Sequence, residues 1–456
     1  MSEAPGKPER MTKRHPPYCQ FVPPWLLEHL VEPTDRATAT VDPISQAVQQ
    51  TLTTDARIRA DRQATSRRTP PRATTPVWAV YTAGSTQTLP GKLLRTAGQP
   101  DNADPAVNET ATGGQAALDL FSQVYGRNSY DNAGAEVIMS VHYGQRYDNA
   151  FWNGTQLVFG DGDGQIFDRF TKPVDVLAHE LSHAVTEHTA GLVYSDEPGA
   201  LNESMSDVFG ICAKQRLLGQ TAQQADWLIG EGIFLPGVKA RALRDMAHPG
   251  TAYDDPKLGK DPQVGSYADY VHTSNDNGGV HINSGIPNRA FQLAAMGIGG
   301  SSAEGAGKIW YAALTGHDVG PNTDFAGFAA ATVAAAGAHA AIVRQAWTTV
   351  GVTPAAGSTS KVGTPAAPAR VSVRRTGGFA GMTRTGEVDL EGDDPRVTVV
   401  RRLVERTDFT AIRTQDSRPD AFSYTFSLPD REEVTVAEHQ LTHDLRRLVE
   451  LLLDQE

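Results

Sequence analysis

Residues 175–207, DVLAHELSHAVTEHTAGLVYSDEPGALNESMSD, decide the fold of this chain, because they hold an H-E-x-x-H pattern followed at a distance by an acid. The two histidines are His179 and His183, and Glu180 follows the first of them. Residues four apart lie one above the other on one face of a helix, so both imidazoles can point at one place with Glu180 beside it. The pattern therefore predicts a helix that binds a metal ion.

A third ligand is expected at Glu203, twenty residues beyond the second histidine. The turn-rich segment 195–199 breaks the chain between two helical stretches, so the second helix can return beside the first. Two neutral imidazoles and one carboxylate, with a fourth position left to water, are the ligand set of a catalytic zinc site. Asp207 and Asn202 could each accept the second ring N–H of a liganding histidine. Histidines on an ordinary surface helix are the alternative, which N-E-x-x-x-D at this distance disfavours.

Composition and length limit the class of protein. A chain of 456 residues with 39% hydrophobic and 21% charged residues has room for roughly three globular domains. No apolar run reaches the length of a membrane helix, which predicts no membrane partner. The net charge of −12 disfavours nucleic acid as the main partner.

The N-terminus and the cysteines bear on location. The first residues, MSEAPGKPERMTKRHPPYC, lack the apolar core of a secretory signal. Cys19 and Cys212 are too few for a disulfide framework, which agrees with a reducing compartment. We therefore expect a cytoplasmic protein, or one that is exported without a Sec signal peptide.

The first part of the chain, residues 1–76, is polar and contains one apolar cluster, FVPPWLLEHL at 21–30, before a helical stretch at 43–62. A segment of this size is too small to fold alone, so its apolar side chains should pack on another part of the chain. A disordered tail with an apolar patch is the alternative.

The rest of the chain divides by its periodicity. Alternating apolar residues in VWAVY and VIMSVHY, with a helix expected at 112–125, predict a β-rich lobe over residues 77–172. The Ala-rich residues 173–350 are helical, with helical patterns at 288–296, 303–314 and 325–350. A cleft is expected between the two lobes.

A C-terminal part follows a linker. Residues 351–370 are rich in Pro, Ala, Gly, Ser and Thr, which is typical of a linker. Residues 371–456 predict a small α+β module, with helices near 395–407 and 439–453. The sequence as a whole therefore predicts an α+β fold: an N-terminal segment, two lobes, a linker and a small C-terminal domain.

Several motifs resemble the thermolysin family of zinc endopeptidases. They are HELSHAVTE, AGLVY and GALNESMSD in the first stretch, NAFWNG and GDGDGQIF upstream of it, and ALRDM and DNGGVHINSGIPN downstream. This resemblance covers most of residues 77–350. It implies a two-lobed zinc-dependent neutral endopeptidase that acts on proteins or peptides.

The resemblance also implies the catalytic roles. Glu180 would take a proton from the zinc-bound water and pass it to the leaving amine. His281 and Tyr194 match the positions that donate hydrogen bonds to the oxyanion, and Asp276 would orient His281 and favour its charged form. A histidine in a glycine-rich loop is the alternative for His281.

Substrate-binding residues follow from the same match. Asn149 and Ala150 correspond to edge-strand positions that bind the substrate backbone as an added strand. Arg244 corresponds to the arginine that binds the carbonyl beyond the scissile bond. The residues that line the primary specificity pocket would be Phe167, Val176 and Leu243. An apolar pocket of this kind selects a large hydrophobic residue immediately after the cut bond.

Both ends of the chain carry further resemblances. The PPWLL segment at 23–27 resembles the short propeptide of the protealysin-like branch, with cleavage expected within 67–74. The Cys19 thiolate could occupy the open zinc position, although a half-buried cysteine is the preferred interpretation. GGFAG at 377–381 and the order of elements resemble emfourin, an inhibitor of protealysin-like enzymes; an unrelated accessory module is the alternative. Propeptide and inhibitor-like domain are thus the expected intramolecular partners.

Two points remain open in the sequence. Asp175 and Glu231 fit calcium-binding acids of the family, but Lys214 stands where another acid is expected. An ammonium group opposes a dication cluster, so we expect no double calcium site, while weak binding at a single site stays possible. The alternative function is a non-catalytic, zinc-stabilised binding protein that presents the C-terminal module.

Overall fold

The computed structural model describes residues 20–31, 43–64 and 77–355, and shorter stretches of the last part of the chain. These stretches are 370–376, 384–390, 394, 396–397, 400, 403–404, 407, 422–428, 433–441 and 443–453. The chain forms two compact units, Met1–Ser358 and Thr359–Glu456. Cys19, the segment 67–74 and the GGFAG motif lie outside the described residues.

The first lobe is built on a five-stranded sheet with the order β2-β1-β3-β5-β4. Its strands are β1 (Trp78–Thr82), β2 (Lys92–Thr96), β3 (Val137–Val141), β4 (Ala150–Trp152) and β5 (Leu157–Phe159). Strand β3 is parallel to both β1 and β5, whereas β2 and β4 run antiparallel to their neighbours. Since β4 stands last in the order, its outer edge is available to an added strand.

A helix covers this sheet, but it begins earlier than its sequence pattern predicts. Helix α3 (Pro105–Asp119) starts at Pro105, not at residue 112, and continues as a π-helical turn, Leu120–Val124. Asp104 caps it by accepting a hydrogen bond from the backbone of Ala106, and proline suits the first helical position. Asp104 followed by Pro105 is a helix-start signal in the sequence. It precedes the apolar periodicity on which the predicted start at residue 112 is based.

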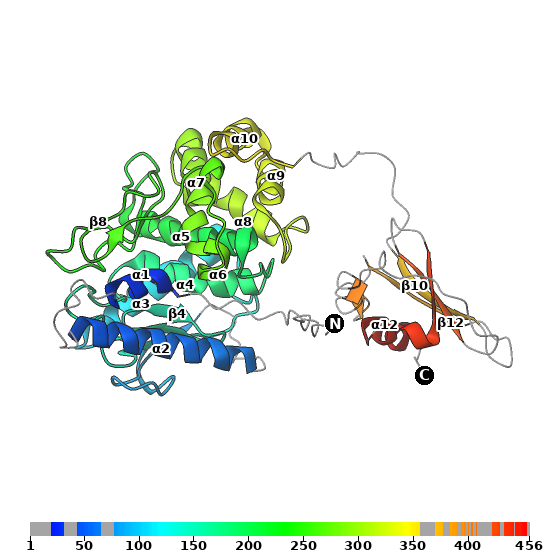
Figure 1. Cartoon of the computed structure of the whole chain (residues 1–456), viewed down its shortest axis with the longest axis horizontal. Coiled ribbons are helices and arrows are strands. Elements are labelled where there is room, and N and C mark those ends of the chain that lie inside the picture. The colour runs from blue at the N-terminus through cyan, green and yellow to red at the C-terminus, as the bar shows by residue number, and fades with distance from the viewer. Residues whose placement is uncertain are drawn as a thin grey trace, which may run out of the picture. The chain divides into compact units, whose positions relative to one another are not determined.

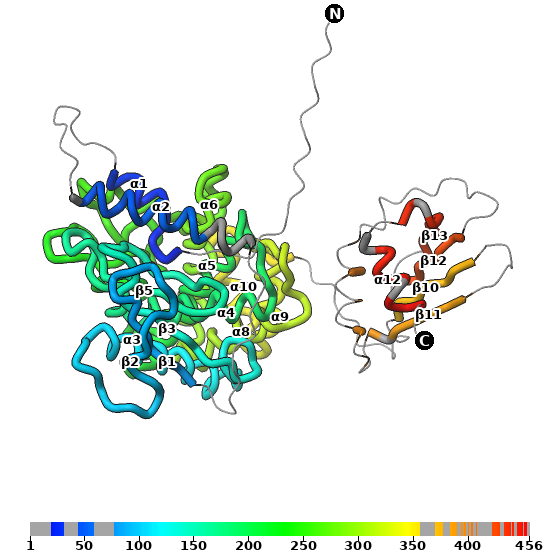
Figure 2. Tube along the Cα trace, turned by 90° about the horizontal axis from the view of Figure 1, so that it is seen from below, coloured from blue at the N-terminus to red at the C-terminus, as the bar shows by residue number. Residues whose placement is uncertain are grey.

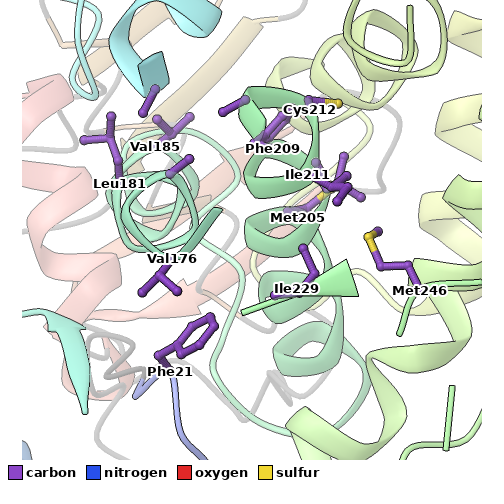
Figure 3. Packing of buried hydrophobic residues seen from close by; sticks show 14 of the residues in the cluster. Phe21, Val176, Leu181, Val185, Met205, Phe209, Ile211, Cys212, Ile229 and Met246 are labelled. Carbon is purple, nitrogen blue, oxygen red and sulfur yellow. The ribbon is translucent and has the colours of Figure 1, made fainter. Parts of the chain in front are cut away.

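The second lobe is centred on helices α4 (Val174–Glu187) and α5 (Asp196–Leu218), which pack along each other (Figures 1 and 3). Figure 3 shows apolar side chains of both helices in one cluster, among them Leu181, Val185, Met205 and Phe209. Gly210 allows the close approach, because a Cβ there would lie 2.9 Å from the backbone oxygen of Asp175.

Further helices complete this lobe: α6 (Asp276–Asn283), α7 (Gly285–Ile298), α8 (Lys308–Thr315), α9 (Phe325–Ala335) and α10 (Ala340–Thr349). Four short strands pair in two ribbons, β6 (Leu228–Ile229) with β7 (Arg244–Asp245), and β8 (Asp254–Asp255) with β9 (Gly259–Lys260). The prediction of one continuous helical pattern over 325–350 is wrong. Gly337 has a φ of 52°, which ends α9 and starts a 3-10 turn before α10.

The N-terminal segment packs on the two lobes. Its helices α1 (Pro24–Val31) and α2 (Pro43–Ala64) lie along one side of this unit (Figure 2). Phe21, Val22, Leu26 and Leu27 are fully buried and belong to the main apolar cluster of the unit. The described part of this segment is therefore folded against the two lobes, as its apolar residues predict, and the alternative of a disordered tail fails there.

The C-terminal unit contains an antiparallel sheet with the order β11-β10-β12-β13. Its elements are β10 (Arg370–Thr376), β11 (Arg384–Asp389), β12 (Ser423–Ser427), β13 (Val434–Ala437) and helix α12 (His443–Leu453). Helix α12 begins at residue 443, not at 439, because a 3-10 turn, Glu438–Gln440, precedes it. Its buried leucines share one core with alternate residues of β10 and β12.

The expected α+β class is confirmed, with a β-rich lobe, a helical lobe and a small C-terminal unit. Among the residues that the structure describes, no helix is long and apolar enough to cross a membrane.

Candidate metal centre and substrate cleft

The side chains of His179, His183 and Glu203 converge between α4 and α5. The two histidine Nε2 atoms lie 3.0 Å apart. The Glu203 carboxylate oxygens lie 3.6 Å from Nε2 of His179 and 3.7 Å from Nε2 of His183. Within the described parts of the chain, this is the group of His, Cys, Asp and Glu residues whose ligand atoms are close enough to share a metal ion.

The Nδ1 atoms of both histidines are hydrogen-bonded on the side away from the centre, and this leaves their Nε2 atoms to bind a cation. Nδ1 of His179 lies 2.9 Å from Asp207 Oδ1, and Nδ1 of His183 lies 2.8 Å from Asn202 Oδ1. Asn202 donates its own N–H to Leu192 O at 3.2 Å, which leaves its oxygen to accept from His183. Each Nδ1 therefore carries the proton, and both Nε2 lone pairs face the same point. Two facing lone pairs and a carboxylate match the donor set of zinc.

Asp207 links this centre to Arg244. It accepts hydrogen bonds from Arg244 Nε at 2.8 Å, from Arg244 NH2 at 2.7 Å and from Asn288 Nδ2 at 2.8 Å, besides that from His179. Burial alone would raise the pKa of Asp207, but Arg244 and His179 outweigh it and lower the pKa. The metal ligand and the arginine are thus oriented by one carboxylate.

Glu180 is buried beside the metal ligands. Its side chain is fully buried, and a hydrogen bond from the backbone of Trp152 favours its charged form. Burial, helped by the nearby charge of Glu203, raises the pKa of Glu180 well above its usual range. A carboxylate held in this way is suited to take and return a proton.

His281 faces the centre from α6. Its Nδ1 lies 2.6 Å from Asp276 Oδ1, and its backbone N–H donates to Asp276 Oδ2 at 3.0 Å. Burial opposes the charge on this imidazole, but Asp276 and Glu203 outweigh it and raise the pKa of His281 to about 9. The Tyr194 hydroxyl lies 3.3 Å from His281 Nε2 and donates to Glu203. A charged imidazole and a phenol therefore border one place, as oxyanion donors must.

The N-terminal segment binds along the outer edge of β4. Phe21 donates its backbone N–H to Ala150 O at 3.1 Å, on the free edge of β4. Asn149 accepts from Val22 N at 2.8 Å and donates to Val22 O at 3.1 Å. The carbonyl oxygen of Gln20 lies 3.1 Å from His281 Nε2, and Arg244 donates to the carbonyl of Phe21 at 3.3 Å. Three residues expected to bind substrate, Asn149, Ala150 and Arg244, thus bind this segment, and so does His281.

The side chain of Phe21 fills a pocket at the base of α4. Its ring lies edge-on to His179, with centroids 5.2 Å apart, and 4.8 Å from the guanidinium carbon of Arg244. Gly230 borders both the ring and Leu243, since a Cβ there would lie 3.1 Å from the ring and 3.3 Å from Leu243 Cβ. Figure 3 shows Val176 next to Phe21.

Phe167, also expected in this pocket, packs its ring against two other phenylalanines. Its centroid lies 5.8 Å from that of Phe170 and 5.3 Å from that of Phe234. The sequence analysis had not identified Gln20 or Phe21 as residues of the cleft. The sequence feature that could have indicated them is an aromatic residue, Phe21, close before the Pro-Pro turn.

A second cluster of charge lies at Lys214 on α5. Its ammonium nitrogen lies 3.1 Å from oxygens of Asp226, Glu231 and the backbone of Leu228. Asp175 is fully buried nearby; burial raises its pKa to about 6, although Lys214 opposes the shift. An ammonium group therefore stands among the acids that the family resemblance assigned to calcium.

The GDGDG segment at 160–164 leads into a turn closed by an aspartate side chain. Asp163 accepts hydrogen bonds from the backbone of Gln165, Ile166 and Phe167 at 2.8 to 3.0 Å. Asp161 pairs with His142, a residue that the sequence analysis did not mark.

Comparison with protein families agrees with this geometry. Residues 60–187 match the thermolysin metallopeptidase catalytic domain, and residues 190–352 match the alpha-helical domain of the same metallopeptidases. Residues 373–453 match emfourin.

Individual relatives point the same way. An extracellular metalloprotease of Pectobacterium carotovorum subsp. carotovorum is 48% identical over 345 residues, which cover 74% of this chain and 97% of the relative. A thermolysin of Alicyclobacillus acidocaldarius subsp. acidocaldarius is 44% identical over 225 residues, 48% of this chain and 39% of that protein. Among solved structures, the precursor of protealysin from Serratia proteamaculans matches with a TM-score of 0.67 and 46% identity, covering 74% of this chain and 100% of that one.

Proposed function

From the premise that this chain belongs to the thermolysin family of metallopeptidases, we propose which bonds it cuts, which residues cut them and what restrains it. The chain is a zinc-dependent neutral endopeptidase that is made as a precursor. Its proposed targets are peptide bonds on the amino side of large hydrophobic residues.

The observation that carries this proposal is the seating of Gln20, Phe21 and Val22. Their backbone pairs with the edge strand, and the phenylalanine side chain fills the apolar pocket. A substrate strand would bind through the same backbone groups, with its own hydrophobic residue in place of Phe21. The pocket beside His179 therefore selects the residue that follows the cut bond.

The proposed chemistry uses groups already held in position. Zinc, when bound by His179, His183 and Glu203, supplies a Lewis acid and lowers the pKa of water. Glu180 takes the proton of the attacking water and gives it to the leaving nitrogen. His281 and Tyr194 donate to the oxygen that gains charge.

The remaining residues position the substrate. Asp276 holds His281 in its charged form and fixes the ring. Arg244 binds the next carbonyl, as it binds that of Phe21. Asn149 and Ala150 hold the backbone of the strand. Asp207 and Asn202 orient the two ligand histidines.

A peptide panel tests the specificity. Peptides that differ only in the residue after the scissile bond should be cut with the order Phe and Leu far above Asp, by about 100-fold in kcat/KM, because an apolar pocket rejects a carboxylate. Equal rates for Phe and Asp would show that this pocket does not bind the residue after the cut.

We also propose that both terminal parts restrain the enzyme. The described part of the N-terminal segment occupies the cleft, so the precursor must lose it to act. The C-terminal unit matches emfourin, and on its tether it would reach an effective concentration around millimolar. Deleting residues 371–456 from the processed enzyme should raise its activity; no rise would reject inhibition in cis.

Calcium and location complete the proposal. Lys214 neutralises the acids around it, so we expect no double calcium site there. One relative is named as an extracellular metalloprotease, which favours export over a cytoplasmic location.

A further inference from the structure

The backbone of the N-terminal segment places one particular peptide bond at the centre of the cleft. The carbonyl oxygen of Gln20 lies 3.1 Å from His281 Nε2, the proposed oxyanion donor. The next residue, Phe21, donates its N–H to Ala150 O at 3.1 Å and offers its carbonyl to Arg244 at 3.3 Å. The bond between these two residues therefore occupies the register of a bond to be cut.

The side chains support the same register. The residue after this bond is a phenylalanine, and it fills the pocket bordered by Gly230 and Leu243. Glu180 is fully buried at the same centre. The direction of the backbone, the side chain after the bond and the nearby proton acceptor therefore all match a bound substrate. A segment that only blocked the cleft would need none of these three features.

We infer that the precursor hydrolyses its own Gln20–Phe21 bond and keeps residues 21–64 in the cleft as the bound product. This inference rests on the proposed function and names a self-cleavage site for it. The reaction adds one water molecule: its hydroxyl group forms a bond to the Gln20 carbonyl carbon, and the bond from that carbon to Phe21 N breaks. The second proton of the water goes to Phe21 N through Glu180.

Several contacts hold the segment on the C-terminal side of the cut. Val22 is bound by Asn149, and Asp148 N donates to Thr51 Oγ1 at 3.1 Å. The buried carboxylate of Asp55 accepts from Tyr147 and Asn149. The new amine of Phe21 can still donate to Ala150 O. The cut therefore removes residues 1–20 without opening the cleft, and activation needs a second cut beyond Ala64.

Mass spectrometry and N-terminal sequencing of the purified, zinc-loaded full chain over time test the inference. A new N-terminus at Phe21 should appear with a rate that does not change over a tenfold range of protein concentration, because site and bond belong to one chain. Phe21→Leu should keep this cut, since leucine fits the pocket. Phe21→Asp and Glu180→Gln should lack it.

Cleavage of an external peptide is measured in the same samples. Peptidase activity with residues 1–20 still attached, or with a first cut elsewhere, would overturn the self-cleavage and leave the proposed function standing. Absence of the cut in the full chain, together with absence of activity after an added protease has removed the N-terminal segment, would overturn the two together.

Retention of the product has its own test, which does not depend on activity. Two shortened Glu180→Gln chains, one starting at Phe21 and one at Pro24, are compared with the full-length Glu180→Gln chain by thermal unfolding. The first should melt within about 2 °C of the full-length chain, and the second several degrees lower, at ~2 to 4 °C per kcal/mol. A chain starting at Phe21 that melts as low as the one starting at Pro24 would contradict a retained product.

Discussion

The metal centre lies between α4 and α5, and the Lys214 cluster brings Lys214 of α5 together with acids of the segment after this helix; each gathers carboxylates around a point of positive charge. At the metal centre, two histidine lone pairs and Glu203 face one another, so the positive charge must come from a bound ion. At the second cluster the chain supplies the charge itself, through the Lys214 ammonium group. Helix α5 therefore takes part in one site for a cation from outside and supplies the cation of the other.

Burial explains why the two clusters depend on their cations to different degrees. The ligand side chains at the metal centre are at most 4% exposed, so water cannot screen them. The side chains of Asp226 and Glu231 are 37% and 50% exposed, and solvent weakens their repulsion. Losing the cation should thus abolish function at the first cluster and cost only stability at the second.

The largest effect is expected at the metal centre. Glu203→Gln removes a charged ligand from a buried dication, so the affinity for zinc should fall by more than about 100-fold, beyond the loss typical of an outer residue. Zinc content after dialysis against a buffered chelator measures it. Glu231→Gln, in the other cluster, serves as the control and should keep its zinc. Equal zinc content in the two variants would break the distinction between the clusters.

A smaller effect is expected at Lys214. Lys214→Gln leaves Asp175, Asp226 and Glu231 without their ammonium partner, which should cost about 2 kcal/mol of folding stability. Millimolar calcium should then restore part of the lost melting temperature in the variant and leave that of the wild type unchanged. Thermal unfolding with and without calcium decides this. A wild type that gains as much from calcium as the variant would show that Lys214 does not replace the ion.

The smallest effect is expected at a third charged group, His142, which lies between Asp161 at 2.9 Å and Asp104 at 2.7 Å. The hydrogen bond to Asp161, opposed by burial and helped by Asp104, raises the pKa of His142 to about 9. A raised pKa stabilises the fold fully below the unfolded value of ~6.5 and loses this contribution as pH rises through 9.

The variant His142→Gln isolates that contribution. The wild type should have a larger free energy of unfolding than the variant, and this advantage should be about 1 kcal/mol greater at pH 6 than at pH 9.5. The expected value is small because the site is partly solvent-exposed. Urea unfolding of both proteins at the two pH values measures the difference. A difference that stays constant with pH would mean that the two aspartates do not hold the charge of His142.

The metal centre could be predicted from sequence because helical spacing alone places His179 and His183 on one face. Lys214 was equally visible as a basic residue in an acidic pattern. The seating of Phe21 was not, because the register of a short segment on an edge strand depends on tertiary contacts with Asn149 and Ala150. His142 escaped for the same reason, since its two partners come from separate loops.

The most direct test of the central claim separates metal binding from catalysis at Glu180. Glu180→Gln, processed by a removable trace of wild-type enzyme, should keep one zinc per chain while kcat/KM falls by about 10²- to 10⁴-fold. Glu187→Gln is the matched control: this buried acid of α4 accepts a hydrogen bond from Trp152 Nε1 at 2.9 Å, which glutamine can preserve, so zinc and activity should persist. A Glu180→Gln enzyme that retains wild-type activity would contradict the account.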